Sequence, residues 1–495
     1  MFSLTRALRQ AECSAESREA GLKSPELTRI ARLWKREVLS HRGWQRHILF
    51  LLAAIAIGFV AWFFQIAERE GDHWFSFLKG ETALWDGGWS VPEPLATFLP
   101  MIWVTLSMLL IVTLRDRYFR GTEGTGIPQT IATLKTTDVA IRDRMLSGRI
   151  LIGKILLLTM GLFSGMTLGR EGPSVHVGAA LMHMITKWVQ FPEHLVRRGL
   201  ILGGGGAGIA AAFNAPLAGL VFSFEEIARS FEKNNVGTVI RSVIISSVFI
   251  VLVLGKDYLF YGRIESTDEN WTIGQWASIF LIGIIGGFLG GAFAQGTIKG
   301  SALARRCMKW NRWVTPLALG AGLSVLGYLS DGESYGSGYQ QTQLILRGGV
   351  EYPWYFAPLT AAASFLTLAS GIPGGLFDPS LTVGAGIGQT MLPVVSMVSP
   401  GLEPEAVIMM FMVAYFAGVV QSPITCAIIM VEMTAARHMT LPLLGVAVVS
   451  YECSRLVCRT SLYESLANTF LAGLDKNPEF KQVSGHDTTT QPPAK

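Results

Sequence analysis

Charge is scarce in this sequence of 495 residues. Asp, Glu, Lys and Arg together make up 16%, while hydrophobic residues make up 50%. So small a charged fraction excludes a disordered chain and does not suit a water-soluble globular protein. Basic clusters interleaved with aromatic residues are also missing, which argues against nucleic-acid binding. The composition is that of an integral membrane protein.

Cysteine is scarce as well. The five cysteines are odd in number, scattered and without the spacing of metal ligands, so we expect them to be reduced and structural (Cys13, Cys307, Cys426, Cys453 and Cys458). An intramembrane enzyme would need a paired nucleophile and base or a metal cluster, and no H-E-x-x-H motif is present. We therefore expect no enzyme, no metal site and no cofactor.

Long apolar runs are what the sequence has instead. They predict several transmembrane helices and lie at residues 48–64, 98–114, 150–163, 239–254, 276–293 and 407–420. The sequence therefore predicts an all-α integral membrane protein.

The distribution of positive charge predicts the topology. Residues 1–46 hold ten Lys or Arg against five acids, too basic and too long for a signal peptide, so we expect a cytosolic arm with an amphipathic helix around Leu27–Trp34. The connection at 68–91 is acidic, and the next carries Arg115, Arg117 and Arg120. We expect a transmembrane domain over 47–470, a disordered polar tail over 471–495, and both termini in the cytoplasm of a multi-pass protein in the inner (plasma) membrane.

Three apolar segments contain many helix breakers: LGREGPSVHVGAA, GGGGAGIAAAFNAPLAG and SGIPGGLFDPSLTVGAG. In lipid, broken backbone is tolerated only where it is buried in protein or lines a polar cavity. We therefore expect these segments to face a transport pathway.

The broken segments recur in order in the second half of the chain. Gly124–Thr130 (GTGIPQT) resembles Gly336–Thr342 (GSGYQQT), 212 residues later, and GREGPSVHVGA resembles GLFDPSLTVGA 206 residues later. Asn-Ala-Pro, with Glu225 nine residues after its proline, resembles Gln-Ser-Pro, with Glu432 nine residues after its proline. We predict two repeats, roughly residues 90–270 and 271–450, with a binding site at their interface.

The chemistry of these segments favours an anion. A helix that begins inside the membrane presents unpaired N–H groups and a partial positive charge, and glycine lets an ion approach the backbone. The alternative is that glycine and proline serve only close helix packing. A cation-coupled symporter of organic solutes would share the repeats but should offer carbonyls and carboxylates to its cation.

The ordered set of motifs resembles the CLC family of chloride channels and chloride/proton exchangers over about residues 45–470. The motifs are GTGIP, GREGP, AAAFNAPLAG followed by Glu225-Glu226, GGLFDP, and the tyrosine of SLYES. The resemblance implies a CLC-like fold of two inverted-topology repeats with tilted, discontinuous helices. It also implies a homodimer with an anion pathway in each subunit.

The resemblance assigns roles to individual positions. Glu171 would be the external gating glutamate, and Glu226 the internal proton-transfer glutamate. The anion would be held by the hydroxyls of Thr125 and Tyr463 and by backbone amides, which are those of Leu376, Phe377, Arg170 and Gly172.

Physical chemistry supports competition at this gate. A carboxylate beside converging helix starts is held ionised by the same field that binds chloride, so Glu171 and the anion compete for one place. The alternative role of Glu171 is that of a structural first-turn acid. Because Glu225 and Glu226 are adjacent, they point about 100° apart on a helix, and the residues alone do not choose between them. Glu226 could instead mark a helix end and pair with Arg229.

Some positions depart from the family pattern or have a second interpretation. Thr125 stands where the family usually has serine, which could shift selectivity. Asp378 stands where the family usually has a small or apolar residue, and we interpret it as a helix N-cap, or else as a carboxylate that weakens anion binding or relays protons. His176 and His183 are expected to pack or to line the pathway.

The predicted function is therefore chloride/proton antiport across the bilayer, with chloride and protons as ligands. The alternatives are a passive, proton-independent chloride channel of the same family and a transporter of nitrate or fluoride. No large cytosolic nucleotide-binding pair follows Tyr463, so adenine-nucleotide control is not expected.

Overall fold

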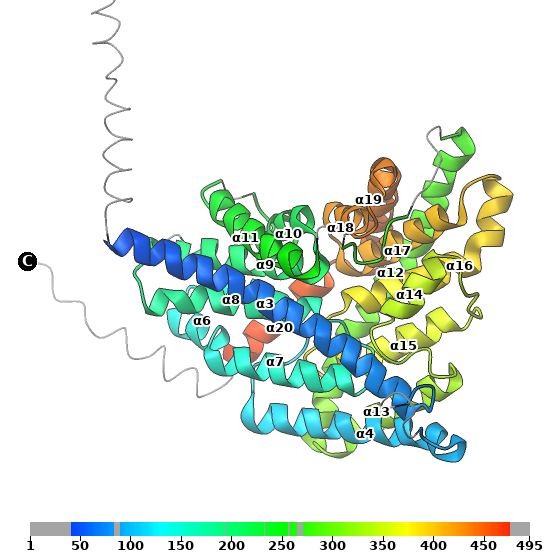
Figure 1. The fold of residues 1–495 in the computed structure, drawn as a ribbon, viewed down its shortest axis with the longest axis horizontal. Helices are drawn as coiled ribbons and strands as arrows, with labels where there is room; N and C mark the ends of the chain where they lie inside the picture. The colour runs from blue at the N-terminus through cyan, green and yellow to red at the C-terminus, as the bar shows by residue number, and fades with distance from the viewer. Residues whose placement is uncertain are drawn as a thin grey trace, which may run out of the picture.

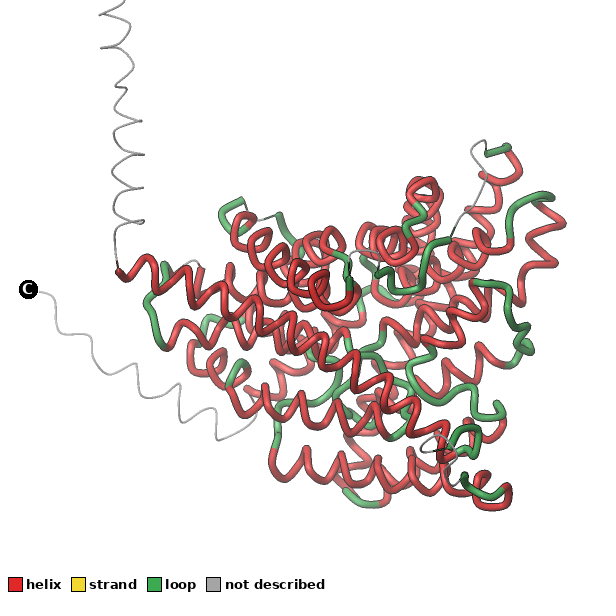
Figure 2. The backbone as a smooth tube through the Cα atoms, in the orientation of Figure 1, coloured by secondary structure: helices red, strands yellow, loops and turns green. Residues whose placement is uncertain are grey.

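The described part of the chain is entirely helical. The structure is a computed structural model, and it describes residues 41–83, 90–193, 195–231, 233–255, 258–264 and 271–475. Within these ranges there are helices and no strand, as Figure 2 shows, apart from one isolated antiparallel bridge between Gly169 and Gly375. The prediction of an all-α protein is confirmed. The amphipathic helix expected in the N-terminal arm, and the tail beyond Asp475, lie outside the described residues.

The first half of the chain contains long helices and short broken ones. The helices are α3 (His41–Leu78), α4 (Glu93–Tyr118), α5 (Ile127–Lys135), α6 (Val139–Met145), α7 (Gly148–Phe163), α8 (Glu171–Met184), η1 (Ile185–Lys187), η2 (Leu195–Gly199), α9 (Leu200–Phe213), α10 (Pro216–Phe222), η3 (Ser223–Ala228) and α11 (Val236–Leu254).

The second half repeats this alternation of long and short helices. Its helices are α12 (Ile273–Trp310), α13 (Val314–Leu329), α14 (Tyr339–Leu346), α15 (Phe356–Ala369), α16 (Phe377–Val398), α17 (Pro404–Val420), α18 (Pro423–Thr434), η4 (Arg437–Met439), α19 (Thr440–Val457) and α20 (Leu462–Asp475). The described helix α20 therefore extends five residues past the predicted domain end at residue 470.

Among the described residues, seven spans are long and apolar enough to cross a membrane. They are 41–78, 93–118, 139–163, 236–254, 273–310, 377–398 and 437–457. The apolar helices between them, such as α9 and α17, are only 10–17 residues long. At 1.5 Å per residue, helices this short are shorter than a typical transmembrane helix. The helix breakers predicted this for α9, whereas the apolar run at 407–420 was expected to form a transmembrane helix and lies in the 17-residue α17.

A connection between helices was predicted at 68–91. This prediction is wrong for residues 68–78, because α3 continues to Leu78. The polar stretch still has a buried helical stripe, formed by Glu68, Gly71, Phe75 and Leu78 at spacings of three and four residues. A Cβ at Gly71 would lie 2.7 Å from the carbonyl of Leu162, so α3 approaches α7 backbone to backbone. In Figure 1, α3 (blue) runs diagonally across the molecule.

The packing of the two halves follows the sequence repeat. Helix α8 packs on α9 and α9 on α11, just as α16 packs on α17 and α17 on α19. Asn214 and Gln421 end α9 and α17 in the same left-handed conformation, with φ of 52° and 63°. The contact pattern is that of a two-repeat fold. The exact repeat boundaries remain predictions.

The third pair of matched motifs carries Glu225 in the first repeat and Glu432 in the second, and the structure gives both glutamates the same role. The carboxylate of Glu432 accepts hydrogen bonds from the amides of Leu217 (3.1 Å) and Ala218 (2.7 Å) at the start of α10. Glu225 does the same at the start of α18, accepting from the amides of Ile424 (3.0 Å) and Thr425 (2.6 Å). Each repeat thus caps a broken helix of the other, which binds the two halves together.

Candidate anion-binding site

Two of the matched motifs meet at the centre of the molecule. The amide of Gly169 donates to the carbonyl of Gly375 (3.0 Å), and the amide of Gly375 donates to the carbonyl of Gly169 (2.5 Å). Helix α8 begins two residues after Gly169 and α16 begins two residues after Gly375. The bridge therefore fixes the N-terminal ends of two half-helices beside each other, from opposite halves of the chain.

A third helix start joins them. Gly126, the residue before α5, has φ of 97°, a left-handed conformation that favours glycine. A Cβ at Gly172 would lie 2.8 Å from the carbonyl of Thr125, so the loop before α5 touches the first turn of α8. The positive ends of α5, α8 and α16 are gathered in one region, an arrangement that stabilises negative charge.

The two hydroxyls predicted at the anion site are both buried. Thr125 Oγ1 and Tyr463 Oη have no hydrogen-bond partner among the described protein atoms. The ring of Tyr463 lies 6.3 Å from the ring of Phe377, at the start of α16. Since buried hydroxyls are normally hydrogen-bonded, two unpartnered ones beside helix starts indicate a bound ligand or water.

Glu171 occupies the joint between the two repeats. Its side chain is fully buried, and Oε1 accepts a hydrogen bond from the amide of Arg170 (3.1 Å), while Oε2 has no partner among the described atoms. A Cβ at either Gly169 or Gly375 would collide with this carboxylate. A carboxyl group of the protein itself thus lies at the helix starts.

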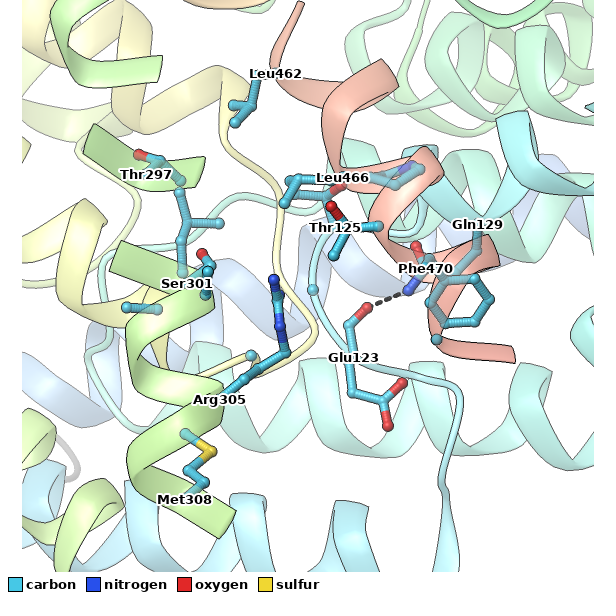
Figure 3. Close-up of a pocket in the computed structure, with 18 of the residues that line it drawn as sticks. Glu123, Thr125, Gln129, Thr297, Ser301, Arg305, Met308, Leu462, Leu466 and Phe470 are labelled. Carbon is cyan, nitrogen blue, oxygen red and sulfur yellow. Dashed lines mark hydrogen bonds between the residues drawn. The ribbon is translucent and has the colours of Figure 1, made fainter. Parts of the chain in front are cut away.

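A cavity of about 800 Å³ reaches this region and is lined by Thr125 and Leu376. Its wall carries four basic residues against two acids, namely Arg115, Arg305, Arg306, Lys309, Asp116 and Glu123. Figure 3 shows Thr125 and Arg305 across from one another, with Leu462 and Leu466 of α20 on the same cavity. A wall of this charge concentrates small anions near Thr125.

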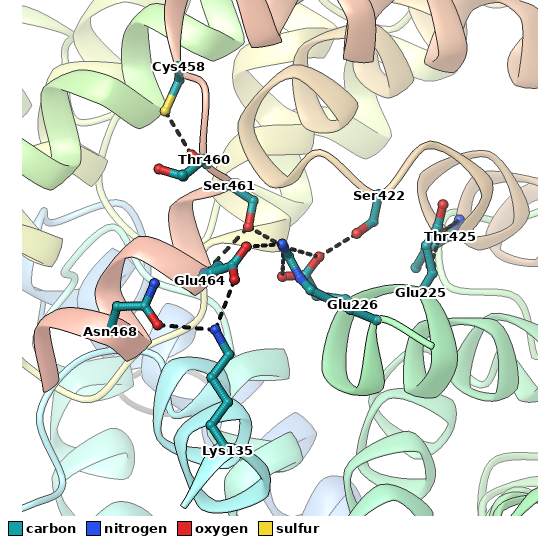
Figure 4. A network of polar contacts seen from close by, with 11 residues as sticks. Lys135, Glu225, Glu226, Ser422, Thr425, Cys458, Thr460, Ser461, Glu464 and Asn468 are labelled. Carbon is teal, nitrogen blue, oxygen red and sulfur yellow. Dashed lines mark hydrogen bonds and ion pairs between the residues drawn. The ribbon is translucent and has the colours of Figure 1, made fainter. Parts of the chain in front are cut away.

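The structure gives Glu225 and Glu226 different roles, which the sequence alone could not distinguish. Glu225 is taken up by capping α18, whereas Glu226 is fully buried (Figure 4). Glu226 accepts a hydrogen bond from Ser422 Oγ (2.5 Å) and pairs with Arg229 (3.2 Å). The side chain selected by the family resemblance is therefore the one that points inward.

A chain of hydrogen-bonded side chains leads from Glu226 to the surface. Arg229 also binds Glu464 and Ser461, and Lys135 Nζ donates to Glu464 Oε1 (2.8 Å). The hydrogen bond from Lys135, helped by the charge of Arg229, holds the pKa of Glu464 below its ordinary value. Glu464 is therefore ionised at neutral pH and anchors Arg229.

His176 and His183 are packed against other parts of the protein, which is one of the two roles expected for them. His176 Nε2 lies 3.0 Å from the carbonyl of Met145, and His183 Nε2 lies 2.6 Å from Asp143 Oδ1. A Cβ at Gly126 would collide with His176, so this histidine supports the loop that carries Thr125.

The interpretation of Asp378 as an N-cap is wrong. The N-cap residue of α16 is Leu376, and no side chain caps the helix. Asp378 lies within the first turn and is fully buried, and neither carboxylate oxygen has a hydrogen-bond partner among the described atoms. Its side chain makes no hydrogen bond to the first amides of its own helix.

Two charged residues near the site were not predicted from the sequence. Lys154 is fully buried inside α7, and its Nζ donates to the carbonyl of Gly124 (2.5 Å). Glu68, on α3, pairs with Arg170 at 3.3 Å. A signal existed for Lys154, since a charged residue within an apolar run is functional by default. Glu68 was hidden because it lay in an expected loop.

A serine motif elsewhere in the chain does not form a hydrolytic site. Residues 332–336 read Gly-Glu-Ser-Tyr-Gly, the spacing of a nucleophile elbow. Ser334 is buried, and its hydroxyl accepts a hydrogen bond from Ser330 Oγ (2.8 Å) in a turn between helices, without a neighbouring strand. The described residues also contain no group of three potential metal ligands.

Comparison with known proteins gives one consistent result. Residues 107–455 match the family model described as voltage gated chloride channel. The chain is 27% identical over 464 residues to the H(+)/Cl(-) exchange transporter ClcA of Vibrio vulnificus strain YJ016, covering 90% of this chain and 94% of the relative. It is 29% identical over 465 residues to ClcA of Vibrio cholerae serotype O1 strain M66-2, covering 88% and 90%.

Solved structures share the fold. A slow cyanobacterial Cl-/H+ antiporter superposes with a TM-score of 0.74 at 22% identity, covering 87% of this chain and 98% of that one. A CLC-type fluoride/proton antiporter superposes with a TM-score of 0.71 at 20% identity, covering 86% and 99%. The fold predicted from the sequence is confirmed.

Proposed function

Because this chain belongs to the voltage-gated chloride channel family, we propose that it exchanges chloride for protons across a lipid bilayer. The observation that carries the proposal is the place of Glu171. Its buried carboxylate lies where helix starts from both repeats meet, beside the region that holds the unpartnered hydroxyls of Thr125 and Tyr463. Relatives of nearly the same length are named as exchangers of these two ions.

Competition between Glu171 and the anion for one site couples anion movement to proton movement. Ionised Glu171 satisfies the positive ends of α8 and α16, so it excludes a second negative charge from them. Protonation removes its charge, and an anion then takes over the helix starts. An anion nearby in turn makes ionisation of Glu171 less favourable, so that anion and proton favour each other's binding.

The anion site is assigned to six positions besides the gate. The hydroxyls of Thr125 and Tyr463 donate to the anion from one side. The amides at the start of α16, Leu376 and Phe377, and those of Arg170 and Gly172 before and within α8, donate from the helix ends. The cavity wall with Arg305 supplies anions to Thr125.

Glu226 is proposed to pass protons between Glu171 and the inner solution. The pairing of Glu226 with Arg229 that an end-of-helix role predicts is present. Arg229 is shared with Glu464, however, so it can follow Glu464 when Glu226 gains a proton.

The setting of the protein follows from the family and from the charge pattern. We propose a homodimer with one pathway per subunit, in the plasma membrane, with both termini in the cytoplasm. Chloride is the proposed anion because the relatives in sequence are named for it, while a fold neighbour is named for fluoride. Bound chloride ions are the only ligands proposed besides protons.

The decisive experiment is flux from chloride-loaded liposomes that contain the purified protein. A chloride electrode and a pH electrode read the same sample. A chloride gradient is expected to drive uphill proton movement. Chloride efflux without proton movement would instead establish a passive channel, and absence of chloride efflux with efflux of fluoride or nitrate would change the anion.

A further inference from the structure

A single guanidinium binds two carboxylates at the inner end of the proposed proton path. Arg229 Nη2 lies 3.2 Å from Glu226 Oε1, and the same guanidinium binds Glu464 and the hydroxyl of Ser461. The side chain of Glu226 is fully buried, whereas those of Arg229 and Glu464 are 30% and 28% exposed. The buried carboxylate therefore shares its cation with a more exposed one.

Lys135 holds Glu464 from a third element. Its Nζ donates to Glu464 Oε1 (2.8 Å) and to Asn468 Oδ1 (3.1 Å), one turn further along α20, as Figure 4 shows. Lys135 is the last residue of α5, so its ammonium also lies at the negative end of that helix. Glu464 binds Lys135 with Oε1 and Arg229 with Oε2. Glu464 is thus divided between two cations, just as Arg229 is divided between two carboxylates.

The charges of these four side chains balance while Glu226 is ionised. When Glu226 takes a proton from a hydronium ion, an O–H bond forms on its carboxylate, a water molecule is released, and the group of four gains one positive charge. Arg229 keeps an ionised partner, because Glu464 still accepts from it. Without Glu464, the same step would remove the carboxylate partner of Arg229 and would be less favourable. Glu464 therefore makes proton uptake by Glu226 easier.

The other titratable groups around Glu226 do not supply a second cation. Of the helices that pack on η3, α9 and α10 contain no titratable side chain, and α5 contains Lys135 alone. Glu225 is the next residue in the chain and is used as the cap of α18. Cys426 on α18 and Tyr463 on α20 also interact with Glu226 and carry no charge at neutral pH. The ionisation of Glu226 therefore depends mainly on how Arg229 is shared.

We propose that Glu464 is a positioning residue for proton uptake. By sharing Arg229 it raises the affinity of Glu226 for protons, and Lys135 limits this effect by binding the other oxygen of Glu464. The two residues thereby set the pH range over which the inner carrier is loaded. This inference rests on the proposed exchange function and adds residues that tune its inner step. Neither Glu464 nor Lys135 carries the transported proton.

Two variants of one ion pair test the proposal in liposomes, with chloride and proton flux read together from equal pH on both sides. Glu464→Gln leaves Arg229 to Glu226 and favours its ionised form, so the pH at which proton flux falls to half should move down by about half a unit. Lys135→Gln leaves Glu464 to Arg229, so this pH should move up by a similar amount. A merely structural clamp predicts the same direction for both, because both variants weaken the same contact between α5 and α20.

The double variant Lys135→Gln/Glu464→Gln shows whether Lys135 acts through Glu464. If it does, the double variant should have the pH profile of Glu464→Gln, whereas charges that act independently through space would cancel and restore the wild-type profile.

Matched variants separate this effect from general damage. Glu81→Gln breaks a surface ion pair with Lys79 (2.7 Å), just after α3, and should leave the pH profile unchanged. In a Glu226→Gln background, Glu464→Gln should change chloride flux by less than about twofold, since the group it acts on is already neutral. The variants should fold, because Lys135 and Glu464 are 35% and 28% exposed, and α5 and α20 both contribute to the main buried apolar cluster.

Failure of the exchange function and failure of the positioning role give different results. If wild-type protein moves no protons uphill, the exchange function itself fails. If the wild type pumps protons and the two single variants shift the pH profile in the same direction, or leave it unchanged, the positioning role of Glu464 is refuted while exchange stands. A wild-type profile in the double variant would likewise refute the action of Lys135 through Glu464.

Discussion

Removal of the Tyr463 hydroxyl isolates a single contact of the proposed anion site. The hydroxyl is buried and has no hydrogen-bond partner among the described protein atoms, so Tyr463→Phe breaks no protein hydrogen bond there. The ring contacts, including that with Phe377 at 6.3 Å, are kept. Any loss of chloride affinity can then be assigned to the contact between hydroxyl and anion.

The size of the loss follows from the charge of the acceptor. A hydrogen bond to a charged group contributes about 1.5–3 kcal/mol. Since every 1.4 kcal/mol is a factor of ten, the dissociation constant for chloride should rise about 10- to 150-fold. Isothermal titration of the detergent-solubilised protein with chloride measures this change directly.

Thermal stability gives an independent measurement of the same quantity. Chloride at about one hundred times the wild-type Kd stabilises the folded state by about 2.7 kcal/mol. If Kd rises about thirtyfold, the same chloride concentration stabilises the variant by only about 0.9 kcal/mol. The melting temperature of Tyr463→Phe should therefore respond less to chloride than that of the wild type.

Tyr335→Phe is the matched control. Its hydroxyl donates to the carbonyl of Ser324 at 2.9 Å, away from the site, and its removal should cost about 1 kcal/mol at every chloride concentration. The rise in melting temperature that chloride produces should be the same in Tyr335→Phe as in the wild type. A Kd of Tyr463→Phe within twofold of wild type, with an unchanged chloride-dependent increment, would refute the placement of this hydroxyl on the anion.

Three further predictions concern the glutamates. Glu171→Gln should abolish proton coupling in the liposome assay while chloride flux persists, because the amide cannot titrate, and continued uphill proton movement would contradict its role as the gate. Glu226→Gln should stop proton movement with chloride flux intact, and a normal ratio of the two fluxes would exclude it as the inner proton carrier. Glu225→Gln and Glu432→Gln should each lower the free energy of unfolding by about 1–2 kcal/mol, since each weakens a helix cap, with proton coupling unchanged in the molecules that remain folded. Loss of coupling in Glu225→Gln alone would show that the wrong member of the adjacent pair had been assigned to the proton.

The class of the protein and the location of its site could be read from local sequence. Apolar runs and the lack of charge specify a membrane protein, since each residue contributes independently to transfer into lipid. The breaks at GTGIP, GREGP and GGLFDP are likewise local, because proline and glycine act on the backbone of their own turn. Recurrence of these breaks in order was enough to place an interface between two repeats.

The extent of α3 was not predictable from hydropathy. Residues 68–78 look like a polar loop, but Glu68, Gly71, Phe75 and Leu78 form a stripe that other helices bury. Glu68 is compatible with this position only because Arg170, about one hundred residues later, lies within ion-pair distance. Secondary structure at this place depends on a tertiary partner.

What the sequence determined by itself was thus the membrane class, the broken helices, the repeat and the set of candidate residues. Only the tertiary structure decided which of two neighbouring glutamates is buried, and that Asp378 does not cap its own helix. The physical reason is that a capping hydrogen bond depends on groups that lie about two hundred residues apart in the chain. Adjacent side chains such as Glu225 and Glu226 look alike in the sequence, and each meets a different partner in the other repeat, Thr425 for Glu225 and Ser422 for Glu226.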